Sequence, residues 1–177
     1  MVLVRSHALI SLLGDLIMDT KTIMASLCFI THNNRVLLLE RNKKVNDFHN
    51  GRFVGVGGKV EEGESPRENV IREVREEAGL EVTPTFRGML YESFVTTAKQ
   101  KERNWVVFIY STELPLGGTL NEDTREGTFH WVALEDVKKT FMWEGDYPLL
   151  DIILLSEECF EVTTKYVDEI LTKWVRH

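Results

Sequence analysis

Three glutamates with helical spacing are the residues of this chain that are most suited to chemistry. Glu73, Glu76 and Glu77 stand at i, i+3 and i+4, so on a helix they would share one face. Carboxylates crowded in this way repel each other unless a cation lies among them. Hard, negatively charged oxygen ligands suit Mg²⁺, and Mn²⁺ is also compatible. The spacing therefore predicts a divalent-metal site, whereas a solvated acidic helix face is the alternative interpretation.

The residues around the glutamates predict the helix that must position them. Ser65 and Glu68 have the spacing of a capping box, Pro66 would occupy the first helical position, and Gly79 is a natural helix end. We therefore expect a helix over residues 66–78. Its second face is mostly apolar, which suits packing on a sheet. That face consists of Arg67, Ile71, Val74 and Ala78.

The segment from Gly58 to Leu80 resembles the Nudix box: glycine, five residues, glutamate, seven residues, then Arg-Glu-aliphatic-x-Glu-Glu-x-Gly-aliphatic. The chain fills every fixed position of this pattern without a gap. These positions are Gly58, Glu64, Arg72, Glu73, Val74, Glu76, Glu77, Gly79 and Leu80. The resemblance favours a metal site over a solvated face. It implies a metal-dependent pyrophosphohydrolase that cuts a nucleoside diphosphate linked to another group.

The resemblance also implies individual roles within the box. In MutT-like members, glutamates matching Glu73, Glu76 and Glu77 hold the metal, and a backbone carbonyl matching that of Gly58 can join them. Glu73 or a neighbouring glutamate would orient or deprotonate the attacking water.

Three charged residues would support this centre. Arg72 precedes Glu76 by four residues and is placed to pair with it and fix its rotamer; an ordinary surface ion pair is the alternative. By resemblance, Glu64 shapes the loop before the helix. Lys59 is expected either to reach a substrate phosphate or to remain solvated.

Glu126 is the metal-ligand candidate outside the box. It lies five residues before Trp131, in a segment that resembles the family's Glu-Gly loop before a hydrophobic strand, where a glutamate approaches the metal. Glu122 and Asp123 are competing candidates, and each of the three is otherwise a loop charge.

The segment from Phe141 to Leu150 is the candidate for base recognition. It resembles a stretch of oxidised-purine triphosphatases in which a tryptophan stacks on the purine and an acid binds its edge. Trp143 and Asp146 would take these roles, with Phe53 lining the pocket. The alternative is that Trp143 is a core anchor and Asp146 caps the following helix. Val54 departs from these enzymes, which carry a base-reading asparagine there, because valine has no hydrogen-bonding side chain.

Length and charge restrict the class of protein and its partners. A chain of 177 residues with 43% hydrophobic residues is typical of one globular domain. The net charge of −7 argues against a nucleic acid polymer as partner, but a small nucleotide with its metal remains compatible. Cys28 and Cys159 are too few and too far apart for a metal centre, so free thiols in the cytoplasm are expected. The sequence leaves monomer and homodimer open.

The hydrophobic patterns predict an α/β (α+β) fold. We expect one domain over residues 18–177, preceded by an extension, residues 1–17, whose interrupted and short apolar run suits neither a signal peptide nor a membrane span. Strands are predicted at 22–31, 35–41, 53–60, 86–96, 104–112 and 127–132. Besides the helix at 66–78, we expect a helical turn at 134–138 and helices at 148–155 and 164–175. The resemblance adds the Nudix fold, a mixed β-sheet sandwiched between helices.

The leading functional hypothesis is a nucleoside triphosphate pyrophosphohydrolase that converts an oxidised purine nucleotide such as 8-oxo-dGTP to its monophosphate, as in DNA repair. A second hypothesis is a Nudix hydrolase of another nucleoside diphosphate derivative, such as ADP-ribose. A third is a nucleotide-binding regulator without catalysis. The complete set of box glutamates argues against the third, because degenerate modules typically lack one.

Overall fold

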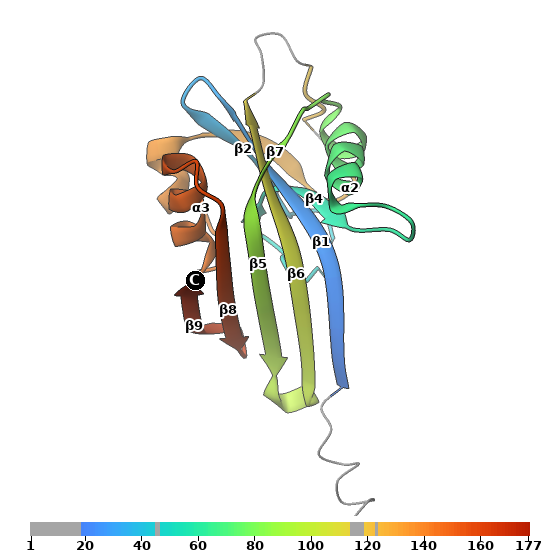
Figure 1. Ribbon diagram of the computed structural model, residues 1–177, viewed down its shortest axis with the longest axis vertical. Helices are drawn as coiled ribbons and strands as arrows, with labels where there is room; N and C mark the ends of the chain where they lie inside the picture. Colours follow the sequence, from blue (N-terminus) through green and yellow to red (C-terminus); the bar gives the residue numbers. More distant parts are fainter. Residues whose placement is uncertain (1–18, 45–46, 114–118, 123) are drawn as a thin grey trace, which may run out of the picture.

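The computed structural model describes residues 19–44, 47–113, 119–122 and 124–177, so the expected extension at residues 1–17 lies outside the described chain. Within these ranges the strands form one mixed sheet in the order β3-β2-β1-β6-β5-β8-β9, with β4 paired to β1 and β7 to β2. Helix α2 (Pro66–Glu73) lies on one side of the sheet and α3 (Asp146–Leu155) on the other (Figure 1). The predicted α+β sandwich is confirmed.

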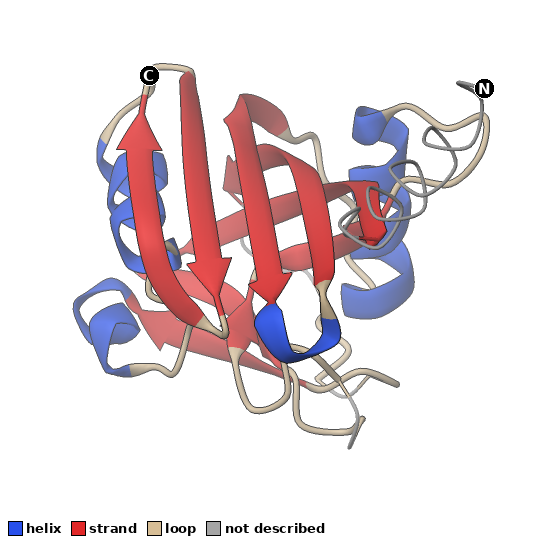
Figure 2. Ribbon diagram, turned by 90° about the horizontal axis from the view of Figure 1, so that it is seen from below, coloured by secondary structure: helices blue, strands red, loops and turns tan. Residues whose placement is uncertain are grey.

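The strands pair both along and against the chain direction. Their bounds are β1 (Asp19–His32), β2 (Arg35–Glu40), β3 (Phe53–Val54), β4 (Val56–Lys59), β5 (Thr85–Thr96), β6 (Lys101–Glu113), β7 (Thr128–Ala133), β8 (Phe160–Val167) and β9 (Ile170–Arg176). The β1–β6 and β5–β8 pairs are parallel, and the other pairs are antiparallel. Seen from below, helices flank the strands on both sides (Figure 2).

Two buried clusters hold the layers together, one on each face of the sheet. On the α3 side, Leu149 and Ile153 pack against sheet residues such as Leu90. On the α2 side, Val70 and Val74 pack against sheet residues that include Leu37, Leu39 and Val56. Burial of these apolar side chains is the main stabilising contribution, at about 1.5–3 kcal/mol for each fully buried Val, Leu or Ile.

The first hairpin is confirmed. β1 turns into β2 through Asn33 and Asn34, whose φ angles are 48° and 59°. Asparagine tolerates this left-handed conformation, and two such residues in succession match the right-handed twist of a hairpin. Of the other predicted elements, residues 134–138 fall in a 3₁₀ segment (Leu134–Lys139), and the predicted helix at 148–155 begins two residues earlier, at Asp146.

The predicted C-terminal helix at 164–175 is wrong, because this region forms the antiparallel strands β8 and β9. Buried residues alternate along β8, at Phe160, Val162, Thr164 and Tyr166, which is the period of a strand. The turn at Asp168 and Glu169 has φ angles of 49° and 68°, and the Asp168 carboxylate accepts hydrogen bonds from Thr97. The alternation with a period of two and this turn are both features of a strand pair, and neither fits a helix.

Two negative findings concern the described residues only. None of their helices is long and apolar enough to cross a membrane. Cys28 and Cys159 are both free thiols, the first buried and the second exposed, and burial raises the pKa of Cys28 to about 12. Cys28 is therefore an inert core residue at neutral pH.

Candidate active site

The acidic helix begins with the predicted capping box. The Ser65 hydroxyl accepts a hydrogen bond from the Glu68 backbone N–H at 3.3 Å, and the Glu68 carboxylate accepts one from the Ser65 N–H at 2.8 Å. Pro66 occupies the first turn, where its missing N–H costs nothing. The helix is tied to the sheet by Asn69, which accepts from Ser26 of β1 at 2.5 Å and donates to the carbonyl of Lys59 in β4 at 2.8 Å.

The second half of the helix is wider than predicted. Residues Val74–Ala78 form a π-helical turn, and Gly79 ends it in the left-handed conformation with a φ of 69°. Single π turns of this kind are frequent at functional sites. Here the turn carries Glu76 and Glu77, whereas Glu73 is the last residue of the α-helical part.

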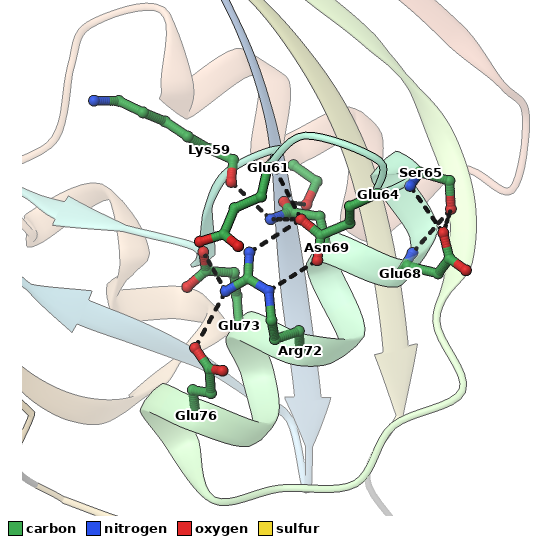
Figure 3. A network of polar contacts seen from close by, with 10 residues as sticks. Lys59, Glu61, Glu64, Ser65, Glu68, Asn69, Arg72, Glu73 and Glu76 are labelled. Carbon is green, nitrogen blue, oxygen red and sulfur yellow. Dashed lines mark hydrogen bonds and ion pairs between the residues drawn. The ribbon is translucent and has the colours of Figure 1, made fainter.

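Arg72 gathers three of the box carboxylates, as Figure 3 shows. Its Nε and Nη2 atoms donate to the two oxygens of Glu64 at 2.8 and 3.1 Å, and Nη1 donates to Glu73 and Glu76 at 3.1 Å each. Mainly through this contact, the pKa of Glu64 falls to about 2. Glu64 also accepts from the Glu61 N–H and from Asn69, so it closes the loop before the helix. Arg72 is thus a central bridge between loop and helix, with Glu76 as one of its partners.

Replacing Arg72 with lysine is expected to lower Mg²⁺ affinity about 10- to 100-fold, because an ammonium cannot reproduce the fork that holds Glu64 while reaching Glu73. Titration calorimetry would measure this affinity. Arg75→Lys is the matched control, because Arg75 makes the same two-point contact with Glu81 on the exposed surface. Equal affinities in the two variants would contradict the positioning role of Arg72.

An acidic cleft opens beside the π turn. It has a volume of about 560 Å³ and is lined by Glu73, Glu76, Glu77, Asn121, Thr124, Arg125 and Glu126. The structure therefore brings Glu126 to the box glutamates from a distant part of the chain. Glu122 is exposed and does not line the cleft, and Asp123 lies outside the described residues.

Burial and mutual repulsion raise the pKa of two carboxyls in the cleft. Burial is the largest cause for Glu77, followed by the charges of Glu126 and Glu73, and its pKa rises to about 7. The pKa of Glu73 is also raised, again mainly by burial. The Glu77 Oε2 atom is buried and has no hydrogen-bond partner in the part of the chain that the structure describes. A buried carboxylate oxygen without a partner is costly, so this position favours a cation.

Glu126 is held by cations of the chain itself. Its carboxylate forms ion pairs with Arg41 and Lys44 from the loop after β2. Its backbone is fixed by Thr124, whose hydroxyl accepts from the N–H groups of Glu126 and Gly127 at 3.0 and 3.1 Å. Among the described residues, no three acidic, His or Cys side chains already surround a common point at metal-ligand distance. Chelation therefore requires carboxylates to turn from their cationic partners.

The cleft nevertheless fits a divalent cation. Its donors are carboxylate oxygens, the set preferred by Mg²⁺, and Glu77 Oε2 is unsatisfied. Gly58 approaches the same point from β4, since a Cβ atom there would lie only 2.5 Å from Glu73 Oε1. Gly58, Glu73, Glu76, Glu77 and Glu126 would hold the ion, with Glu76 at the exposed rim.

The candidates for base recognition do not line the acidic cleft. Trp143 is only 3% exposed; it packs with Phe94 and Tyr166 and is stacked by Phe48 at 5.0 Å between ring centroids. The Arg52 guanidinium lies 3.7 Å from the Trp143 ring centroid. The core-anchor alternative thus describes the observed packing, and stacking of a base on Trp143 requires Phe48 or Arg52 to move.

Asp146 is the first residue of α3, and it faces a second acid that the sequence analysis missed. Glu92 of β5 is 8% exposed, and burial together with the charge of Asp146 raises its pKa. Burial likewise raises the pKa of Asp146 to about 7. At least one of the two carboxyls can therefore carry a proton near neutral pH and donate a hydrogen bond.

The remaining candidates lie around this region. Phe53 is half-buried, with its ring centroid 5.4 Å from that of His130. Lys59 is exposed and points away from the box glutamates (Figure 3). Its ammonium lies 5.9 Å from the ring centroid of Trp105. Trp105 and Phe48 line a neighbouring cavity of about 160 Å³ together with Phe94, Thr96, Lys99, Lys101 and Arg103.

Comparison with known proteins agrees with the box and with the fold. The model of the NUDIX domain matches residues 21–151. The uncharacterised Nudix hydrolase YvcI of Bacillus subtilis is 29% identical over 143 residues, which is 80% of this chain and 85% of YvcI. The oxidised purine nucleoside triphosphate hydrolase of Mus musculus is 32% identical over 129 residues, 71% of this chain and 77% of that protein. A MutT protein structure from Bacillus halodurans has a TM-score of 0.76 and 26% identity, covering 87% of this chain and 97% of its own.

Proposed function

The chain belongs to the Nudix family of hydrolases, and from that premise we propose that it is a Mg²⁺-dependent nucleoside triphosphate pyrophosphohydrolase, with Mn²⁺ as a possible substitute. The acidic cleft carries this proposal. Glu73, Glu77 and Glu126 line it, and one buried oxygen of Glu77 has no hydrogen-bond partner among the described residues. A cation bound there would neutralise phosphate charge and lower the pKa of an attacking water.

The residues of the chain supply the rest of the mechanism. Gly58, Glu73, Glu76, Glu77 and Glu126 are the proposed ligand set. Glu73 is our candidate for orienting the water and accepting its proton, because it lies between the strand at Gly58 and the cleft. Arg72 holds Glu73 and Glu76 in place. Positioning and electrostatic stabilisation are what phosphoanhydride hydrolysis needs from a protein.

We further propose an oxidised purine nucleotide, such as 8-oxo-dGTP, as the substrate. The mouse relative with that activity in its name supports this choice, at 32% identity. The carboxyls of Asp146 and Glu92, of which at least one can be protonated near neutral pH, suit the hydrogen-bonding edge of a purine. Phe53, Trp143 and Lys59 are the proposed neighbours of base and phosphate. The Val54 side chain offers no hydrogen bond, so selection would depend on the acids.

A relative named CTP pyrophosphohydrolase, from Escherichia coli, makes a pyrimidine triphosphate the competing substrate. That protein is 25% identical over 135 residues, covering 76% of this chain and 93% of its own length. The net charge of −7 supports a small nucleotide rather than a nucleic acid polymer. We propose a single domain over residues 18–177, a cytoplasmic location and a monomer or homodimer.

Turnover of a nucleotide panel would test the substrate. We expect pyrophosphate release from 8-oxo-dGTP with Mg²⁺, a lower kcat/KM for dGTP and CTP, and no release with EDTA. Asp146→Asn should reduce the preference for 8-oxo-dGTP by about 10-fold, because an amide cannot gain and lose a proton as a carboxyl group does. Asp151→Asn is the control, because Asp151 lies on the exposed side of α3. Preference for CTP, or equal loss for all nucleotides in Asp146→Asn, would contradict the purine assignment.

A further inference from the structure

A line of polar contacts connects the acidic cleft with Trp143. Its first member is Arg41, which pairs with Glu126 through Nη1 and with Asp47 through Nε at 2.6 Å and Nη2 at 2.5 Å. The side chains of Arg41 and Asp47 are 16% and 7% exposed. Ion pairs shielded to this extent are screened less than surface pairs.

The second half of this line of polar contacts runs from Asp47 through the neutral imidazole of His49 to Trp143. The other carboxylate oxygen of Asp47 accepts a hydrogen bond from the His49 backbone N–H at 3.0 Å. His49 Nδ1 in turn accepts from the indole N–H of Trp143 at 2.9 Å. Burial, followed by the charge of Arg41, lowers the pKa of His49 to about 4, so at neutral pH Nδ1 has the lone pair that this bond requires.

We propose that Asp47 and His49 are positioning residues that couple the carboxylate of Glu126 in the acidic cleft to the Trp143 wall of the nucleotide site. This inference rests on the proposed function in two respects: a divalent cation binds among the cleft glutamates, and the nucleoside binds beside Trp143. Asp47 and His49 lie outside the Nudix box, and neither lines the acidic cleft.

The coupling follows from competition for one carboxylate. Glu126 forms ion pairs with Arg41 and Lys44, and its side chain also lines the cleft that contains Glu73 and Glu77. When Glu126 turns towards a cation, Arg41 loses one of its two acidic partners and interacts more fully with Asp47. That strengthens the anchoring of His49, and through it the orientation of Trp143. By linkage, a nucleoside that binds at Trp143 must favour cation binding to the same degree.

The indole N–H resonance of Trp143 in the ¹H–¹⁵N spectrum tests this coupling without turnover. The chain has four tryptophans, so Trp143→Phe identifies the resonance. Titration of the intact protein with MgCl₂ alone should shift this resonance, whereas that of Trp131 should stay in place. An unchanged Trp143 resonance at saturating Mg²⁺, with binding verified by calorimetry, would overturn the proposal. Absence of Mg²⁺ binding would overturn both this proposal and the proposed metal site.

Two variants distinguish coupling from ordinary loop packing. Asp47→Asn should keep Mg²⁺ binding but lose most of the shift at Trp143, because the amide no longer holds Arg41 as an ion pair. His49→Asn places an acceptor oxygen where Nδ1 lies and should retain the response, whereas His49→Ala should lose it. Equal behaviour of the two His49 variants would show that the residue only fills space, and this comparison stands even if Asp47→Asn unfolds.

Nucleoside binding gives the reciprocal measurement. Saturating Mg²⁺ should tighten the binding of guanosine, which has no phosphates, by about 5-fold in the wild-type protein and by less than about 2-fold in His49→Ala. Phosphate–metal contacts cannot produce this effect, since guanosine has none. An equal Mg²⁺ effect in both proteins would refute the coupling.

Discussion

Glu77→Gln is expected to stabilise the metal-free protein and to inactivate it. Burial raises the pKa of Glu77 from 4.5 to about 7, so between these values the folded state binds more protons than the unfolded state. Stability from this group is therefore greatest at low pH and is lost as the pH rises through about 7. The glutamine removes the penalty, which is on the order of 1–3 kcal/mol at pH 8. Turnover should fall by about 10³-fold, because one cation ligand is lost.

Chemical denaturation at pH 5 and pH 8 with EDTA would measure the stability gain, which should be larger at pH 8. Glu76→Gln is the matched control, because the Glu76 side chain is 60% exposed and its removal should leave stability nearly unchanged. Glu76→Gln should also lower turnover. A variant of Glu77 that is less stable than wild type at pH 8 without metal would contradict the account of Glu77 as a buried carboxylate repelled by its acidic neighbours.

Gly58→Ala should lower turnover by about 100-fold while leaving the fold intact. The new Cβ atom would lie 2.5 Å from Glu73 Oε1 and 2.8 Å from its Cδ atom. The carboxylate is the end of a flexible side chain, so it can yield, and the free energy of unfolding should change by about 1 kcal/mol or less. Displacing a reacting group by an ångström is nonetheless worth about 100-fold in rate.

Gly57→Ala separates this effect from damage to the sheet. A Cβ atom at Gly57 would collide with the backbone oxygen of Ser26 in β1, and its φ of 155° disfavours a side chain. This neighbouring variant should therefore unfold at much lower denaturant concentration. The kinetic constants and the denaturation midpoint of Gly58→Ala distinguish displacement of Glu73 from damage to the sheet. If stability falls together with activity, Gly58 only permits strand packing.

The part of the acidic cleft that comes from one short stretch of sequence was predictable. The capping box, the apolar face and the glutamate spacing all lie within 23 residues and follow from helix geometry. Glu126 was predicted only through family resemblance, because it reaches the cleft by tertiary folding. Arg41, the partner of Glu126, could not be found from sequence, since the two residues are 85 positions apart and a lone arginine at a strand end has no distinctive pattern.

The base side was less predictable because packing determines what an aromatic residue does. The sequence predicted that Trp143 either stacks on a nucleotide base or packs in the core. Phe48 and Arg52, which lie against the Trp143 ring, come from a loop without a regular hydrophobic period. The C-terminal error has a different origin. Residues 160–166 alternate with a period of two, but the apolar residues Ile170, Leu171, Trp174 and Val175 were also compatible with a helix, and the turn between the two strands has no glycine.

The two parallel strand pairs have a consequence for how the chain reaches this structure. β1 pairs with β6, about 80 residues later, and β5 pairs with β8, about 70 residues later. Such non-local pairing requires long loops to close before it stabilises anything, so folding is expected on the slow side for a domain of this size. During synthesis, β5 would remain an unpaired edge until residues 160–167 emerge from the ribosome. The nascent chain thus completes the acidic cleft well before its sheet is protected from association with other strands.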